Sequence, residues 1–242
     1  MSRLSWIIRR PRHFSAAVAL STLLGLAAHP MTASATDTPT DAAKTAAPEA
    51  PARAPASAAA TTHVEGFRSA HFGMNQAEVR KAIIDDFNIK SAAIKSTTDE
   101  IQKTAILQVT APDVLQGGGI AQVSYIFGYK SKKLIQVHVV WSRDIDPKLT
   151  PDRMLTNGKL LQSYFAGAGY HIMGPNIISG EDMIMFRGND ADNHITALVL
   201  HGTIIPGKNK QQASFVTTGP LTLDYFENLQ KPDIYQLPAG KF

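Results

Sequence analysis

Carboxylate and imidazole side chains that could hold a metal are densest in one short segment, Asp-Ala-Asp-Asn-His over residues 190–194. In an extended backbone, alternate side chains point to one face, so Asp190, Asp192 and His194 could bind the same metal ion. The segment lacks the glycine and the terminal glutamate of a calcium loop, and the chain has no H-E-x-x-H motif. We therefore interpret residues 189–193 as the polar turn of a β-hairpin, and we predict no metal ligand and no cofactor.

Covalent catalysis finds little support in the sequence. The 242 residues include no cysteine, which excludes thiol catalysis, disulfides and Cys-ligated metal sites. No G-x-S-x-G segment marks a serine nucleophile. The glycines at 117–119 lead into a strand pattern without the Lys-Ser/Thr of a phosphate-binding loop. We predict no catalytic residue, and a hydrolase of unrecognised type stays open as an alternative.

Hydrogen-bonding side chains on two neighbouring strand patterns offer a surface that could bind a partner. Gln122 and Ser124 alternate with apolar residues in one segment, and Gln136 and His138 do so in the next. In a paired antiparallel sheet these side chains would share a face. That face is either the ordinary solvent side of the sheet or a flat binding surface for an envelope protein or a glycan. If strand pairing buries His138, or holds Asp190 far from every histidine, the enzyme alternative loses its main support.

Two helices are expected to position these segments. Asn75 has the properties of an N-cap with Glu78 three residues later, which predicts a helix over 76–87. Thr150 followed by Pro151 predicts the start of a second helix, which glycines near residue 167 end.

Short segments with alternating or apolar character predict two sets of three strands, one set after each helix. Tight connections between neighbouring segments require antiparallel pairing. The order predicts an α+β fold with two helices packed on antiparallel sheet, and it suggests a tandem α-β-β-β pseudo-repeat. The predicted strands cover residues 104–110, 121–129, 134–142, 183–188, 194–202 and 221–226.

The N-terminal region has the pattern of a secretory signal peptide. Four arginines precede the first acidic residue, Asp37, and an apolar run and then Ala-Ser-Ala at 33–35 follow them. The run is about 15 residues long, against the roughly 20 that a spanning helix needs. We predict cleavage after Ala35, a periplasmic or secreted location, and no transmembrane segment in the mature chain. Losing four arginines lowers the formal net charge of +4 to zero, which leaves no basic footprint for nucleic acid.

Residues 36–62 are predicted to be a disordered linker rich in Ala, Pro and Thr. They include no aromatic or large aliphatic side chain, so ordering them would bury too little apolar surface to offset the loss of conformational entropy. Residues 63–242 are long enough for a single α+β domain. Its two candidate halves are residues 63–147 and 148–242.

The start of the domain resembles the opening of many small exported bacterial domains. The resemblance lies in residues 67–74, which end in Gly73-Met74, and in Glu78 and Val79 of the helix that follows. It is most similar to the BamE family of outer-membrane assembly lipoproteins and to the β-lactamase-inhibitor-like fold. There a Gly-Met turn leads into a short helix packed on a three-stranded antiparallel sheet, and a tandem form has two such units. The resemblance implies a non-enzymatic, protein-binding module, although this chain lacks the lipidated cysteine of BamE proteins.

The sequence therefore predicts an exported, soluble, non-catalytic envelope protein that serves as a protein-binding or assembly module. Two alternatives stay open. One is a periplasmic enzyme of the hydrolase class, and the other is a structural envelope protein without a discrete ligand.

Overall fold

The structure is a computed structural model that describes residues 60–174, 177–179, 182–206, 213–237 and 240. The predicted signal peptide, 1–35, and the linker up to residue 59 lie outside the described residues. Among the described helices, none is both long and apolar enough to cross a membrane.

Helix α1 spans Gln76–Phe87, the bounds that its sequence predicts. Oδ1 of Asn75 accepts hydrogen bonds from the backbone N–H groups of Ala77 (2.9 Å) and Glu78 (3.1 Å). The Glu78 carboxylate accepts the Asn75 N–H in return at 2.7 Å. This reciprocal capping box satisfies backbone donors that the first helical turn leaves unpaired. Asn88, in the left-handed conformation with φ of 49°, ends the helix.

Helix α2 spans Pro151–Gly167 and begins at the predicted cap, where Thr150 Oγ1 accepts the Arg153 N–H at 3.2 Å. Gly158 in its middle allows a close approach to strand β9 (Asp182–Asn189). A Cβ atom added to Gly158 would stand 2.5 Å from Met185 Sδ. The glycine therefore serves packing, which compensates for its low helix propensity.

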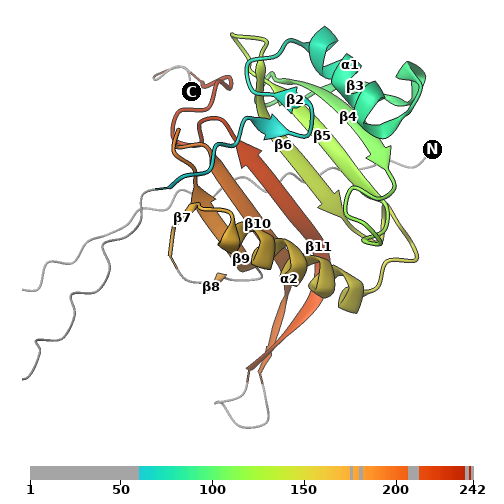
Figure 1. The fold of residues 1–242 in the computed structure, drawn as a ribbon, viewed down its shortest axis with the longest axis vertical. Coiled ribbons are helices and arrows are strands. Elements are labelled where there is room, and N and C mark those ends of the chain that lie inside the picture. Colours follow the sequence, from blue (N-terminus) through green and yellow to red (C-terminus); the bar gives the residue numbers. More distant parts are fainter. Residues whose placement is uncertain (1–59, 175–176, 180–181, 207–212, 238–239, 241–242) are drawn as a thin grey trace, which may run out of the picture. The chain divides into compact units, whose positions relative to one another are not determined.

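Nine strands form one antiparallel sheet in the order β3-β4-β5-β6-β11-β10-β9-β7, with β8 also paired to β9. The unit α1-β4-β5-β6 and the unit α2-β9-β10-β11 meet where β6 pairs with β11 (Figure 1). The predicted α+β fold and the repeated helix-and-three-strands order are thus present. The strands are β3 Lys95–Thr98, β4 Ala105–Ala111, β5 Ala121–Phe127, β6 Leu134–Trp141, β7 His171–Ile172, β8 Ile177–Ser179, β9 Asp182–Asn189, β10 Ile195–Pro206 and β11 Ala213–Phe226.

The strands differ from the prediction at their ends and at the edges of the sheet. Strand β5 ends at Phe127, two residues before the predicted end, and β11 begins at Ala213, eight residues before the predicted start. Strands β3, β7 and β8 are not predicted. All four side chains of β3 are exposed, so no apolar alternation marks it. Strands β7 and β8 have only two and three residues.

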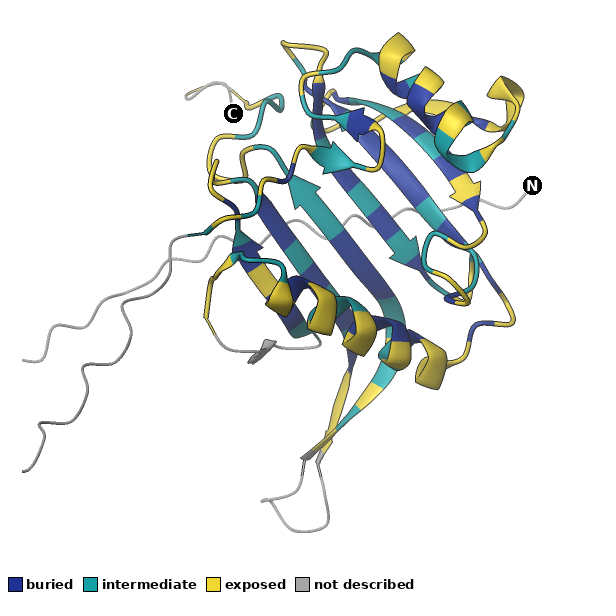
Figure 2. Cartoon of the chain, viewed as in Figure 1, coloured by how far each residue is buried: buried dark blue, intermediate teal, exposed yellow. Residues whose placement is uncertain are grey.

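The core lies between the helices and one face of the sheet (Figure 2). Tyr125, Val139 and Leu223 point to this face from three neighbouring strands and are 0–2% exposed. The side chains that alternate with them point to the opposite face, which no described helix covers (Figure 2), and there Gln122, Gln136 and His138 are half-buried. The sheet thus offers one covered face and one open face.

A small hairpin fixes the entry of the chain onto the covered face. Strands β1 (Gly66–Phe67) and β2 (Ala70–His71) pair with each other, and Phe67 packs 5.9 Å from the Tyr225 ring of β11. The following Gly-Met turn continues onto β6, because Gly73 N–H donates to the carbonyl oxygen of Leu134 at 3.0 Å. The hairpin therefore lies over the seam between the two units (Figure 1).

The C-terminal segment, residues 227–237, returns from β11 to the first unit. The backbone N–H of Tyr129 donates to Asp233 O at 2.7 Å, and that of Tyr235 donates to Gln102 O at 2.8 Å. The Asp233 carboxylate also accepts the backbone N–H groups of Lys130 (3.0 Å) and Ser131 (2.7 Å). The end of the chain thus stabilises the turn between β5 and β6.

Candidate functional site

The four residues predicted as a binding face lie together on the open face of β5 and β6. In the strand register, Ser124 stands opposite His138, and His138 stands opposite Asp224 of β11. His138 Nδ1 lies 2.7 Å from Asp224 Oδ1, and Gln136 Nε2 donates to the same oxygen at 3.1 Å. Ser124 Oγ accepts a hydrogen bond from Gln108 Nε2 at 3.2 Å. Apart from Gln122, the predicted face is thus tied into its own hydrogen-bond network.

Asp224 was missed by the sequence analysis. Its signal is a carboxylate between Leu223 and Tyr225, in a strand where it is the one charged residue. Burial lowers the pKa of His138, but the charge of Asp224 and its hydrogen bond raise it, and the net pKa is raised. Nδ1 is engaged by Asp224, so Nε2 is the nitrogen left to meet a ligand or a proton.

This row of Ser124, His138 and Asp224 has the residue types of a hydrolase triad but not its surroundings. Acyl transfer needs hydrogen-bond donors aimed at the developing oxyanion. The backbone N–H groups beside Ser124 belong to strands paired on both sides, where the sheet ladder uses them.

The segment at residues 190–194 is the turn between β9 and β10, as predicted. Asp190 is buried and organises it: Oδ1 accepts the N–H groups of Asp192 (2.9 Å) and His194 (2.7 Å). Oδ2 accepts the N–H of Val64 at 2.6 Å and lies 3.1 Å from His194 Nδ1. The carboxylate therefore also holds a segment that is 126 residues distant in sequence.

His63 joins this turn, although no motif in the sequence singles it out. Its Nδ1 lies 2.8 Å from Asp192 Oδ2, and this hydrogen bond raises the pKa of His63 and lowers that of Asp192. The ligand atoms of Asp190, Asp192 and His194 lie within 4.8 Å of one another. The enzyme alternative would have lost its main support if His138 were buried or if Asp190 lay far from every histidine. Neither is the case, because His138 keeps 33% of its side chain exposed and Asp190 contacts His194.

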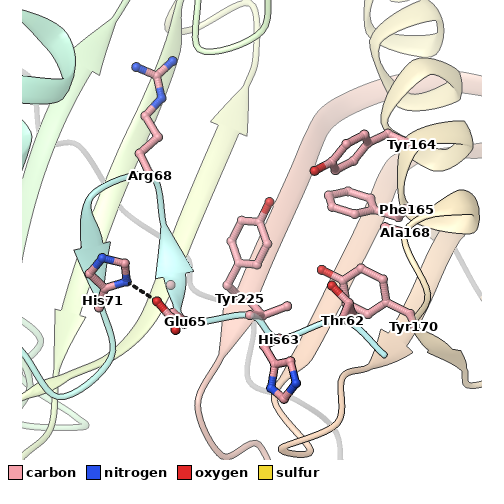
Figure 3. A pocket seen from close by; sticks show the side chains of 12 residues that line it. Thr62, His63, Glu65, Arg68, His71, Tyr164, Phe165, Ala168, Tyr170 and Tyr225 are labelled. Carbon is pink, nitrogen blue, oxygen red and sulfur yellow. Dashed lines mark ion pairs between the residues drawn. The ribbon is translucent and has the colours of Figure 1, made fainter. Parts of the chain in front are cut away.

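A cleft of about 310 Å³ opens between the last turns of α2 and residues 60–65, which we call the strap (Figure 3). Tyr225 of the central strand β11 lies between the two walls. We refer to this feature as the strap–α2 cleft. Its lining residues are Thr62, His63, Val64, Glu65, Gly66, Arg68, His71, Tyr164, Phe165, Ala168, Tyr170 and Tyr225.

Aromatic side chains dominate the α2 side of the cleft. Phe165 is buried and packs edge-on against Tyr170 at 5.9 Å, whereas Tyr164 is 68% exposed. The Tyr170 hydroxyl accepts a hydrogen bond from Thr196 at 3.1 Å. Burial raises the pKa of Tyr225, so its phenol stays protonated, and it makes no hydrogen bond to any residue that the structure describes. Tyr225 therefore offers a free donor to a ligand in the cleft.

Hydrogen bonds at both sides of the strap hold it in place. Thr61 N–H donates to Gly169 O beyond α2 at 2.9 Å, and Thr62 O accepts the Ala191 N–H at 3.0 Å. His63 lies between Thr62 and Val64, whose N–H is held by Asp190, and within the described part of the chain the backbone N–H and C=O of His63 have no partner. Thr61 and Thr62 belong to the predicted linker, so the last linker residues contact the domain.

Two further cleft residues have partners of their own. His71 Nδ1 lies 3.2 Å from a Glu65 carboxylate oxygen (Figure 3). Arg68 donates to the Asp86 carbonyl at the end of α1 at 3.0 Å and lies 4.6 Å from the centre of the Phe87 ring. Arg68 thus ties the β1–β2 hairpin to α1. As far as the described residues are concerned, the Tyr225 hydroxyl and the His63 backbone remain available to a ligand.

Comparison with known proteins gives no relative from which a function could be transferred: no family model, no curated protein and no solved structure matches the chain.

Proposed function

We propose that this chain is an exported, non-catalytic envelope protein that binds an extended segment of a partner protein in the strap–α2 cleft. One observation carries the proposal. The cleft presents the Tyr225 phenol between its walls and the backbone of His63 at its rim, neither with a hydrogen-bond partner among the described residues, beside the exposed ring of Tyr164.

These groups match what an extended polypeptide needs. A strand-like ligand can pair its backbone with a free backbone donor and acceptor, as in β-strand addition. Tyrosine rings supply large contact areas with little loss of side-chain entropy, and their hydroxyl groups add hydrogen bonds. The cleft combines both features beside Tyr225 of strand β11 (Figure 3).

The hydrogen bonding of the open face supports this choice of site. Ser124, Gln136 and His138 already have partners there, which leaves fewer groups, His138 Nε2 among them, to meet a ligand. Among the described residues beside Ser124, the sheet ladder uses the backbone donors that acyl transfer would require, which favours a binding role over the hydrolase alternative.

Export is part of the proposal. The arginine-rich start, the apolar run and Ala-Ser-Ala at 33–35 support a signal peptide that is cleaved after Ala35, with periplasmic or secreted delivery.

The test compares affinity capture from an envelope extract by three tagged forms of the mature chain. They are the wild type, the cleft variant Tyr164→Ala/Tyr225→Phe, and the open-face variant Gln122→Lys/His138→Gln. We expect the wild type and the open-face variant to retain one partner protein that the cleft variant loses. If the cleft variant keeps every partner, or if only glycan is retained, the proposal is wrong.

A further inference from the structure

The meeting point of the strap and the β9–β10 turn gathers more metal-binding side chains than turn formation requires. The turn itself needs only the carboxylate of Asp190. We propose that a divalent transition-metal ion of the zinc class binds at this point, to four side chains: His63, Asp190, Asp192 and His194.

The spacing of the side chains fits this proposal. Asp190 Oδ2 and His194 Nδ1 are 3.1 Å apart, and His63 Nδ1 and Asp192 Oδ2 are 2.8 Å apart. Zinc binds nitrogen and oxygen ligands at about 2.0–2.2 Å, so two neighbouring ligand atoms of one ion lie on the order of 3 Å apart. Each pair therefore has the separation of adjacent ligands. The ligand atoms of Asp190, Asp192 and His194 lie within 4.8 Å of one another, and His63 reaches this group through its contact with Asp192.

The donor set selects the class of metal. Two imidazole nitrogens and two carboxylate oxygens suit tetrahedral zinc. Calcium takes six to eight oxygen ligands, and magnesium keeps an octahedral oxygen shell with several waters. The histidines therefore favour a transition metal over either of these ions.

Contacts behind the ligands orient them. Two backbone N–H groups occupy Asp190 Oδ1, which leaves Oδ2 with the Val64 N–H as its one backbone donor. The ring of His194 packs against Phe72, with the ring centres 5.1 Å apart. Such supporting contacts fix ligand direction and strengthen metal binding.

The other His–Asp pairs on the sheet provide the comparison. His138 with Asp224 and His201 with Asp182 have equally short contacts of 2.7 and 2.6 Å. Within the described ranges, only the turn at 190–194 brings three or more potential ligand residues this close together. A single His–Asp pair satisfies two side chains, whereas here two such pairs are joined by the close approach of Asp192 to Asp190 and His194.

A bound ion would link the strap to the β9–β10 turn. His63 comes from the strap and the other three ligands from the turn, so one ion would join segments that are far apart in sequence. Because the strap forms a wall of the strap–α2 cleft, the ion would hold that wall in place.

The test uses the full chain, freed of metal by a chelator and then titrated with Zn²⁺ by calorimetry and with Co²⁺ as a visible-light probe. We expect one equivalent of metal, the intense absorption bands of four-coordinate Co²⁺, and a rise in Tm with Zn²⁺. His63→Ala and Asp192→Asn should each weaken Zn²⁺ binding at least about tenfold. His201→Ala, which removes a His–Asp pair elsewhere, should leave it unchanged.

The two ligand variants suit the test because both side chains are more than half exposed, and circular dichroism will verify that the variants fold. The absence of saturable Zn²⁺ binding would overturn the proposal. So would a folded His63→Ala variant that binds as tightly as wild type, or equal affinity for Ca²⁺. If the wild-type chain binds no Zn²⁺ but still captures its partner, the metal inference is wrong and the proposed function stands.

Discussion

Nδ1 of His138 lies 2.7 Å from Oδ1 of Asp224, across the β6–β11 seam where the two α-β-β-β units join. Burial disfavours the charged imidazole, but the charge of Asp224 and its hydrogen bond outweigh this effect and raise the pKa of His138. The pair thus links the units electrostatically as well as through the strand ladder.

The raised pKa of His138 predicts a pH dependence of stability. The contribution of the pair is fully present below the unfolded-state pKa of about 6.5. It is lost as the pH rises through the higher pKa of the folded state. The free energy of unfolding lost in Asp224→Asn should therefore be larger at pH 6 than at pH 9, as urea unfolding will measure. A loss that is equal at both values, or larger at pH 9, would refute this prediction.

The helices could be predicted from the sequence because their signals are local. Asn75 with Glu78 and Thr150 with Pro151 lie within a few residues of the helix starts that they determine. Capping depends on contacts inside one turn, so no tertiary information is needed. The central strands could be predicted because their apolar alternation reflects one covered face.

The contacts that build the candidate sites could not be predicted. His138 and Asp224 are 86 residues apart, and they meet only because β6 pairs with β11 in one register. His63 and Asp192 are 129 residues apart and meet because the strap docks on the β9–β10 turn. Neither pairing leaves a periodic signal in the sequence.

The capping box of α1 should be measurable. Asn75→Ala removes the acceptor for two backbone N–H groups and should lower the free energy of unfolding by about 1 kcal/mol. Lys81→Ala, at an exposed position of the same helix, should change it by less than about 0.5 kcal/mol. Chemical denaturation of both variants measures these losses. A loss in Asn75→Ala no larger than that in Lys81→Ala would contradict the role of the cap.

Trp141 tests the assignment of the faces. It is 1% exposed on the covered face, so Trp141→Ala should cost about 3–5 kcal/mol by leaving a cavity. Gln122→Ala on the open face should cost less than about 0.5 kcal/mol. A tolerated Trp141→Ala together with an unfolded Gln122→Ala would mean that the faces are reversed.

Asp233 should stabilise the β5–β6 turn from the C-terminal segment. Burial raises its pKa, but the hydrogen bonds from Ser131 and Lys130 lower it, and the net pKa is depressed. Asp233→Ala should therefore cost about 1 kcal/mol at neutral pH. This cost should shrink as the pH falls through the depressed pKa of the folded state, where wild-type Asp233 becomes protonated. Thermal unfolding at several pH values measures it, and a cost that grows on acidification would count against the assigned role.

Site-specific photo-crosslinking tests the central claim, that a partner protein binds in the strap–α2 cleft, most directly. A photoreactive phenylalanine analogue would replace Tyr164 at the cleft in one variant and Gln122 on the open face in a matched control, in cells that export the chain. We predict a discrete crosslinked protein adduct from position 164 and none from position 122. Adducts from position 122 alone, or from neither position, would contradict the account.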